Sequence, residues 1–326
     1  MGPVLFAWVS FSLYREIERQ QDLQQSWEHI RASAFGSNGW KFLLVLLLMF
    51  VNWGIEARKW QVLVRSIQRI SFFKAFKAVF SGQSLAVNTP NRVGEYVGRV
   101  VYLDEGNRLR GVALTIVGSL SQTIITLLFG LTGMALMSDS ITGSIKDILT
   151  KTGLLQLYPG LAPIAYDIIF YCVLLGVAIM LIVYFEMSWL TKLIERMPFV
   201  KKYSYLIEKL EDFHWAELTR ILSLSVSRYA VFVVQFILLL QVFQVNIPFA
   251  AAAGLVSVFF LVLAVVPTIS SVELSLRGLA AWELFGIMSA NKLGIIATAA
   301  GIWLINLIIP ALAGSLFILG IKLFKR

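Results

Sequence analysis

The feature that most limits the possible folds of this sequence is a set of long apolar runs almost free of charged residues. A helix needs about 20 apolar residues to cross the hydrocarbon core of a bilayer. Six runs are candidate spans, the first of them short: residues 3–14, 40–55, 112–137, 162–185, 221–243 and 293–319. Continuous runs indicate membrane-spanning helices, because the strands of an outer-membrane barrel alternate apolar and polar residues.

Composition agrees, since 58% of the 326 residues are hydrophobic and only 14% are charged. Soluble domains carry about 25% charged residues. The chain therefore has too little polar surface to face water on all sides, and we expect an integral membrane protein.

Two further apolar segments, residues 72–87 and 247–266, differ from the six spans. A proline follows each of them closely, Pro90 and Pro267, and the first segment contains lysines and several polar side chains. Such segments are typical of re-entrant or broken helices, whose irregular backbone is tolerated inside a bundle. The sequence therefore predicts an all-α, polytopic membrane helical bundle with about six full spans and two re-entrant or broken helices.

Lysine and arginine counts alternate along the chain. The segments after the second, third, fourth and fifth spans carry 10, 2, 6 and 2 basic residues, and 3 follow the sixth span. Basic residues concentrate on the cytoplasmic side, so we predict six full crossings with both termini in the cytoplasm. The net charge of +9 fits cytoplasmic loops that face anionic lipid, and no nucleic-acid partner is expected.

A short motif follows both of the irregular segments. It consists of a proline, a glutamate five or six residues later, and an arginine four residues after the glutamate. Its two copies are Pro90, Glu95, Arg99 and Pro267, Glu273, Arg277. We predict a single membrane domain over residues 1–326 that contains two repeats, about 1–137 and about 161–321. Because each repeat has three spans, the second begins on the opposite side, which is the inverted-repeat architecture of many transporters.

The motif residues suit an anion. The first turns of both helices present unpaired N–H groups, and the planar guanidinium fork matches a phosphate. Arg228 lies well inside the fifth span, where an arginine costs about 2.5–3.5 kcal/mol, and we expect Glu273, Glu95 or a lipid phosphate as its partner. The predicted substrate-binding residues are Arg92, Glu95, Arg99, Arg228, Glu273 and Arg277.

A purely structural role is an alternative for some of these residues. Each Glu–Arg pair lies one helical turn apart and could simply stabilise a broken helix. Pro90, Gly94 and Pro267 are predicted to break helices, and the spacing of Gly94 and Gly98 indicates close helix packing. Arg58 is interpreted as an edge residue that snorkels to the surface.

No catalytic set emerges. The sequence has no P-loop, no Gly-x-Gly-x-x-Gly motif, and no serine or cysteine suitably placed beside a histidine. His29, His214 and Cys172 cannot together form a metal site. We therefore expect no catalytic residue, no metal and no cofactor, and we do not expect an enzyme.

Residues 89–99 read Thr-Pro-Asn-Arg-Val-Gly-Glu-Tyr-Val-Gly-Arg. With the Arg58-Lys59-Trp60 step and the second-half Pro267 and Glu273, this sequence resembles the flippase-like membrane family named for the transmembrane region of lysylphosphatidylglycerol synthases. Members of that family often carry glycines where Ser270 and Ser271 stand here. The resemblance implies translocation of a polar lipid between leaflets, in a bacterial cytoplasmic (inner) membrane.

The predicted function is a flippase or transporter that moves a phospholipid, or another phosphate-bearing lipid, through an Arg/Glu-lined cavity near the midplane. Such a cavity would replace part of the hydration that a headgroup loses in hydrocarbon. Two alternatives are a membrane-embedded enzyme that acts on a lipid headgroup and a non-transporting membrane scaffold.

Overall fold

A computed structural model of the chain describes residues 39–87, 89, 92–151, 160, 162–186, 213–266 and 270–319. Within them every regular element is helical. The helices are, in chain order, α3 (Gly39–Val64), α4 (Phe72–Val87), α5 (Gly94–Val100), the 3-10 turn η2 (Glu105–Asn107), α6 (Arg108–Leu136), α7 (Ser138–Lys151), α9 (Ala162–Phe185), α12 (Trp215–Val242), α13 (Phe249–Val265), α14 (Ser270–Phe285), α15 (Lys292–Trp303), the π-helical η5 (Leu304–Ile308) and α16 (Ile309–Leu319).

Five helical stretches are long and apolar enough to cross a membrane, and they match five of the six predicted spans. They are α3, α6 with η2, α9, α12, and the continuous rod of α15, η5 and α16. The protein is therefore an all-α, multi-pass membrane bundle, as predicted. The remaining predicted span, residues 3–14, lies outside the described residues.

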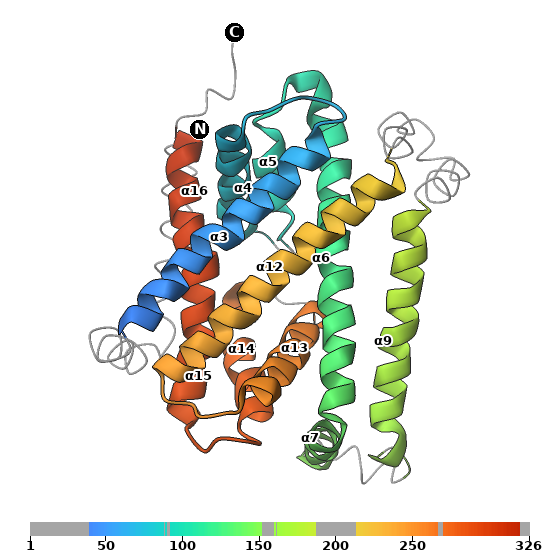
Figure 1. Cartoon of the computed structure of the whole chain (residues 1–326), viewed down its shortest axis with the longest axis vertical. Helices are drawn as coiled ribbons and strands as arrows, with labels where there is room; N and C mark the ends of the chain where they lie inside the picture. Colours follow the sequence, from blue (N-terminus) through green and yellow to red (C-terminus); the bar gives the residue numbers. More distant parts are fainter. Residues whose placement is uncertain are drawn as a thin grey trace.

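Burial separates central helices from peripheral ones. The most apolar window of the α15–η5–α16 rod is 78% buried, whereas that of α9 is 11% buried. In Figure 1 α6 and the rod run along the length of the molecule, and α3 and α12 cross them obliquely. Because α9 packs mainly against α6, most of its surface is left for lipid.

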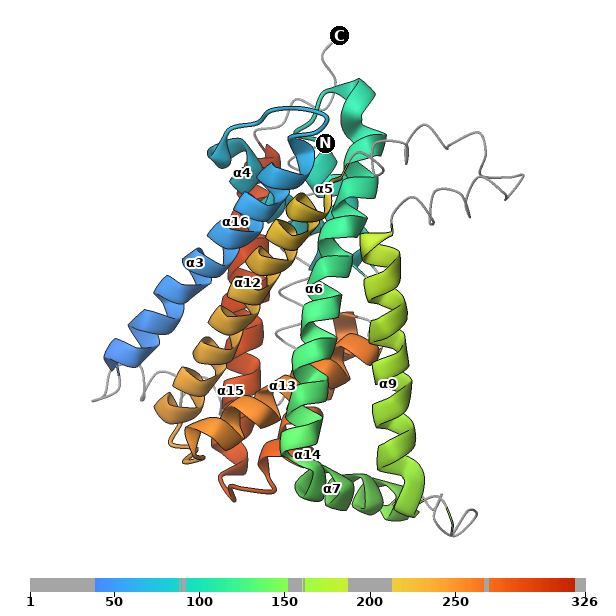
Figure 2. The same cartoon turned by 45° about the vertical axis from the view of Figure 1, so that its right-hand side comes forward.

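The two irregular segments form short helices at opposite ends of the molecule. α4 and α5 lie at the end where α6 begins, and α13 and α14 lie toward the other end (Figures 1 and 2). Helix α4 packs on α16, while α13 packs on α6. Each irregular segment thus packs on the last span of the other predicted repeat, as two inverted copies of one unit would. We therefore retain the inverted repeat as a proposal that the packing supports.

Glycines allow α4 and α5 to touch through their backbones. A Cβ atom on Gly98 would lie 2.5 Å from the carbonyl oxygen of Ser81, and one on Gly82 would lie 3.0 Å from that of Glu95. A Cβ on Gly94 would also collide with the Leu85 carbonyl group. The Gly94 and Gly98 pair thus serves close helix packing, and it fixes the position of α5.

The central rod changes its winding in the middle. Residues Leu304–Ile308 are π-helical, and Pro310 follows them. A proline has no N–H to donate to the carbonyl group four residues earlier, so Asn306 loses a backbone partner there. The sequence predicts a kink at this proline, and the structure shows a local change to wider turns. In this segment the carbonyl oxygen of Leu307 accepts a hydrogen bond from Gln83 of α4 at 3.4 Å.

The close approach of α4 and α5 can be tested with Gly98→Ala. The new methyl group would press on main-chain atoms of α4, which cannot move aside, and we expect a loss of about 1–3 kcal/mol of stability. Gly176→Ala in α9 is the matched control, since nothing lies within 4 Å of the new atom. Thermal unfolding in detergent, followed by gel filtration, measures both. Equal melting temperatures for the two variants would contradict the proposed contact.

Candidate functional site

A single buried carboxylate joins three cations from three helices. Glu56 on α3 is 2% exposed. Its Oε1 lies 2.8 Å from Nη2 of Arg99 on α5. Its Oε2 lies 2.9 Å from Nζ of Lys59, one turn further along α3, and 3.0 Å from Nη1 of Arg228 on α12. Glu56 therefore ties α3, α5 and α12 together through ion pairs.

Arg228 is positioned by more than its ion pair. Its Nε donates a hydrogen bond to Oδ1 of Asn52 at 2.9 Å. Its guanidinium carbon lies 5.2 Å from the ring centre of Trp53 and 5.3 Å from that of Phe232. Cation–π contacts of this kind are most favourable where the cation is desolvated. The side chain of Arg228, 13% exposed, is thus held between an aromatic pair and two polar groups of α3.

Lys59 connects the site to α6. Its ammonium group donates to the carbonyl oxygen of Gly118 at 3.2 Å and to the hydroxyl of Ser225 at 3.4 Å. The Ser225 hydroxyl in turn lies 2.9 Å from that of Ser121 on α6. A lysine that is 1% exposed is therefore satisfied by a carboxylate, a main-chain carbonyl and a hydroxyl.

Helix α5 extends the site toward the central rod. Arg99 also pairs with Glu95, and Nε of Arg92 lies 3.7 Å from Oε2 of Glu95. Arg92 donates to Oε1 of Gln83, and Nε2 of Gln83 lies 3.4 Å from the carbonyl oxygen of Leu307 in η5. The polar chain therefore runs from α3 to the π-helical segment. Both side-chain polar atoms of Asn306 there have no hydrogen-bond partner among the described residues.

Positive charge is in excess in this cluster. Three cations, Lys59, Arg99 and Arg228, face two carboxylates, Glu56 and Glu95, and the half-exposed Arg92 adds a fourth cation. Four buried donors around it find no acceptor in the described chain: Asn52 Nδ2, Trp53 Nε1, Trp60 Nε1 and Arg99 Nε. Buried polar groups are normally paired. A group that supplied acceptor oxygens and negative charge would therefore be stabilised here.

The structure brings together four of the six predicted binding residues, Arg92, Glu95, Arg99 and Arg228. Glu273 and Arg277 belong to α14, whose packing partners are α15, α13 and α7. The two irregular units still approach one another. Leu274 in α14 shares a small apolar cluster with the central rod, and Val87 at the end of α4 packs against that cluster.

Sequence reasoning missed Glu56 and Lys59. It placed the end of the second span at residue 55 or at Trp60 and gave neither side chain a role in the site, whereas α3 continues to Val64 with Glu56 and Lys59 buried. It also expected Arg228 to pair with Glu273, Glu95 or a lipid phosphate, and the structure instead gives it Glu56. The available signal was a Glu–Lys pair three residues apart, flanked by Trp53 and Trp60, on a helix that is mostly apolar.

In the described residues, no three histidine, cysteine, aspartate or glutamate side chains form a group that could hold a metal ion. The chemistry available to the cluster is therefore that of guanidinium, ammonium and carboxylate groups. It can bind an anion and exchange ion-pair partners.

The chain matches the model of a known protein family. The model of the family described as lysylphosphatidylglycerol synthase TM region matches residues 2–314. This range contains the whole charge cluster and both copies of the proline–glutamate–arginine motif, and it confirms the predicted resemblance. A comparison with curated proteins finds no match.

Replacing the shared carboxylate tests the cluster. Glu56→Gln leaves three buried cations with one partner fewer, and breaking a buried ion pair from one side costs about 3–5 kcal/mol. We expect a marked fall in the melting temperature in detergent. Glu105→Gln is the control, because Glu105 is exposed and lies 3.8 Å from Arg108.

The double variant Glu56→Gln/Arg228→Gln removes one charge of each sign and leaves the net charge of the cluster unchanged. It should recover part of the stability that Glu56→Gln loses. A double variant whose loss equals the sum of the two single losses would show that Glu56 and Arg228 are not coupled.

Proposed function

The chain belongs to the lysylphosphatidylglycerol synthase TM region family, and we propose that it moves a phosphate-bearing lipid headgroup between the two leaflets of its membrane. The observation that carries this proposal is the buried charge cluster, in which cations outnumber carboxylates. Buried ionisable groups inside a membrane bundle are expensive and commonly mark the path of a substrate. The family description names a lipid, lysylphosphatidylglycerol, and this supports a lipid as the substrate on such a path.

Guanidinium groups suit this passage because a phosphate that enters hydrocarbon loses its hydration. Arg99 and Arg228 can each offer two parallel N–H donors to phosphate oxygens. The lipid tails need not enter the polar site, since they can remain in the surrounding bilayer while the headgroup crosses.

The carboxylates serve binding and release in this proposal. Glu56 and Glu95 hold the cations when no headgroup is present, so no buried charge is left unpaired. An arriving phosphate takes over part of the hydrogen bonding of Arg99 and Arg228. When it leaves, the carboxylates recover their partners. Binding is thereby an exchange of partners, which prevents the headgroup from being held too tightly to depart.

Alternating access would come from movement of one repeat against the other. Both irregular segments contact the π-helical segment or the residues next to it. Gln83 and Val87 make this contact from α4, and Leu274 makes it from α14. This segment is a suitable hinge, because π-helical turns inside an α-helix often occur at functional positions. Transport by this route breaks no covalent bond, so we propose a transporter and not an enzyme.

Arg228→Gln tests the proposal directly. The protein would be reconstituted in vesicles that contain a phosphatidylglycerol with a fluorescent tail, and a reductant would bleach the outer leaflet. Wild type should expose inner-leaflet lipid to the reductant, and Arg228→Gln should slow this by about tenfold or more, since it removes a charge-assisted contact. Lys77→Gln, at an exposed position on α4, is the control and should transport normally.

The double variant Glu56→Gln/Arg228→Gln separates binding from scaffolding. If Arg228 only neutralises Glu56, the double variant should transport at the wild-type rate once it is folded. If Arg228 binds the headgroup, the double variant stays slow although its stability is partly restored. Wild type that exposes lipid no faster than protein-free vesicles would exclude transport of this lipid.

A further inference from the structure

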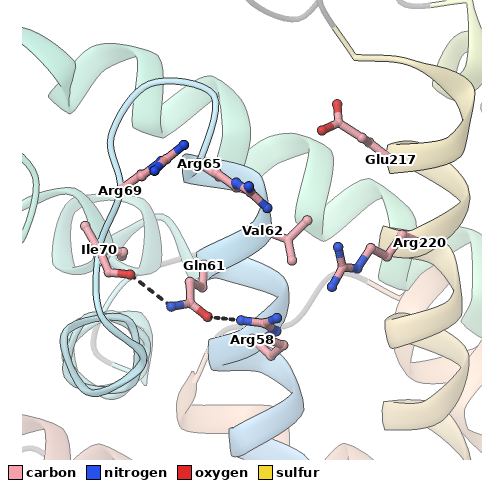
Figure 3. A pocket seen from close by; sticks show the side chains of 8 residues that line it. All are labelled: Arg58, Gln61, Val62, Arg65, Arg69, Ile70, Glu217 and Arg220. Atoms are coloured by element: carbon pink, nitrogen blue, oxygen red, sulfur yellow. Dashed lines mark hydrogen bonds between the residues drawn. The ribbon is translucent and has the colours of Figure 1, made fainter.

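A second group of arginines surrounds a surface pocket at one end of the contact between α3 and α12. Arg58 comes from the last two turns of α3, Arg65 and Arg69 come from the turn and loop that follow it, and Arg220 comes from the second turn of α12. The pocket has a volume of about 260 Å³. In Figure 3 Arg220 reaches from α12 toward Arg58, and Arg65 points into the space between the two helices.

The charges of this pocket are not balanced by acidic neighbours. Glu217 is the one carboxylate among the lining residues, and Figure 3 shows it turned away from Arg58. Among the described residues, no carboxylate forms a salt bridge with any of the four arginines. Four arginines therefore line one pocket with a single carboxylate among its lining residues, and this gives the pocket an excess of positive charge.

Hydrogen bonds join the end of α3 to the loop that lines the pocket. Arg58 donates to the side-chain oxygen of Gln61, and Nε2 of Gln61 donates to the carbonyl oxygen of Ile70 at 2.9 Å. These bonds hold the loop that carries Arg69 against the end of α3. The arginines are thus presented by a braced turn, which lowers the cost of ordering them around a ligand.

The opposite end of the same pair of helices lacks this feature. A cavity of about 850 Å³ lies there, where α3 begins and α12 ends. Its polar lining consists of one cation, Lys41, with the amides of Gln241, Gln244 and Asn246. The concentration of arginine is therefore a property of one end of the α3–α12 contact.

We propose that the pocket of Arg58, Arg65, Arg69 and Arg220 is a phosphate-binding site at the membrane surface, separate from the buried cluster. Basic pockets between membrane helices commonly bind anionic headgroups, and an arginine fork fits a phosphate better than a lysine does. Arg220 precedes Arg228 by eight residues on α12, about 12 Å along the helix. The pocket volume suits a headgroup or a small phosphate ion. This site would bind its ligand whether or not the protein transports lipid.

Native mass spectrometry of the detergent-solubilised full chain tests this. Wild type, Arg65→Gln/Arg220→Gln and the control Lys74→Gln/Lys77→Gln would each be titrated with phosphatidylglycerol, phosphatidylcholine and inorganic phosphate. Both double variants lose two positive charges, so general electrostatic attraction falls equally in both. We expect the pocket variant to bind phosphatidylglycerol about tenfold or more weakly than wild type, and the control to differ by less than about threefold. Melting temperatures of all three proteins confirm that they are folded.

The ligands distinguish the two sources of phosphate. A lipid site retains phosphatidylglycerol well below the concentration at which inorganic phosphate competes, whereas a site for free phosphate binds the inorganic ion at similar concentrations. In either case the affinity must fall in the pocket variant. Arg65→Lys/Arg220→Lys, which keeps the charge and removes the forks, should fall between wild type and the glutamine variant. Equal affinities for wild type, pocket variant and control would overturn the proposal.

Discussion

The ion pairs of Glu56 are the interactions on which the interior of this molecule depends. Lys59, Arg99 and Arg228 share that carboxylate, and a lone cation at any of the three positions would be costly in a bilayer. Because the three cations come from three different helices, they can be buried only when those helices are assembled. The cluster thus makes burial of charge conditional on the correct fold.

The glycine contacts of α4 and α5 serve the same end. Arg99 reaches Glu56 because α5 is held against α4, with Gly98 lying directly over the main chain of Ser81 and Gly82. A bulkier residue would move α5 outward and lengthen the 2.8 Å contact between Arg99 and Glu56. Packing of small residues, which membrane helices use in place of the hydrophobic effect, therefore sets the electrostatics of the site.

The fold was readable from the sequence to the extent that hydrophobicity determines it. Five spans and both irregular segments lie where the apolar runs predict them, because each run must match the thickness of the hydrocarbon core. The residues of the candidate site could be predicted only in part. Arg228 and the motif around Glu95 stand out as charges in unusual places. Glu56 does not stand out, because a glutamate at the end of an apolar run looks like the end of a span. Its role depends on Arg99 and Arg228, which lie 43 and 172 residues further along the chain, and periodicity carries no information about such distances.

The two groups of cations differ in whether they are already paired with carboxylates, and this suits them to different roles in binding a ligand. The buried cations are already paired with carboxylates, so a ligand gains affinity there only by displacing those carboxylates. The arginines of the surface pocket are exposed to solvent and have one carboxylate in their lining, so they can attract an anion without displacing a partner, although salt and water weaken the attraction. A transport route that first binds its ligand at the unpaired surface site and then passes it along the paired, buried cluster has two advantages. No unpaired charge is left inside the membrane, and the ligand is not bound there too tightly to leave. Arg220 precedes Arg228 by eight residues on α12, so the proposed route would join the unpaired surface site to the paired buried one along a single helix.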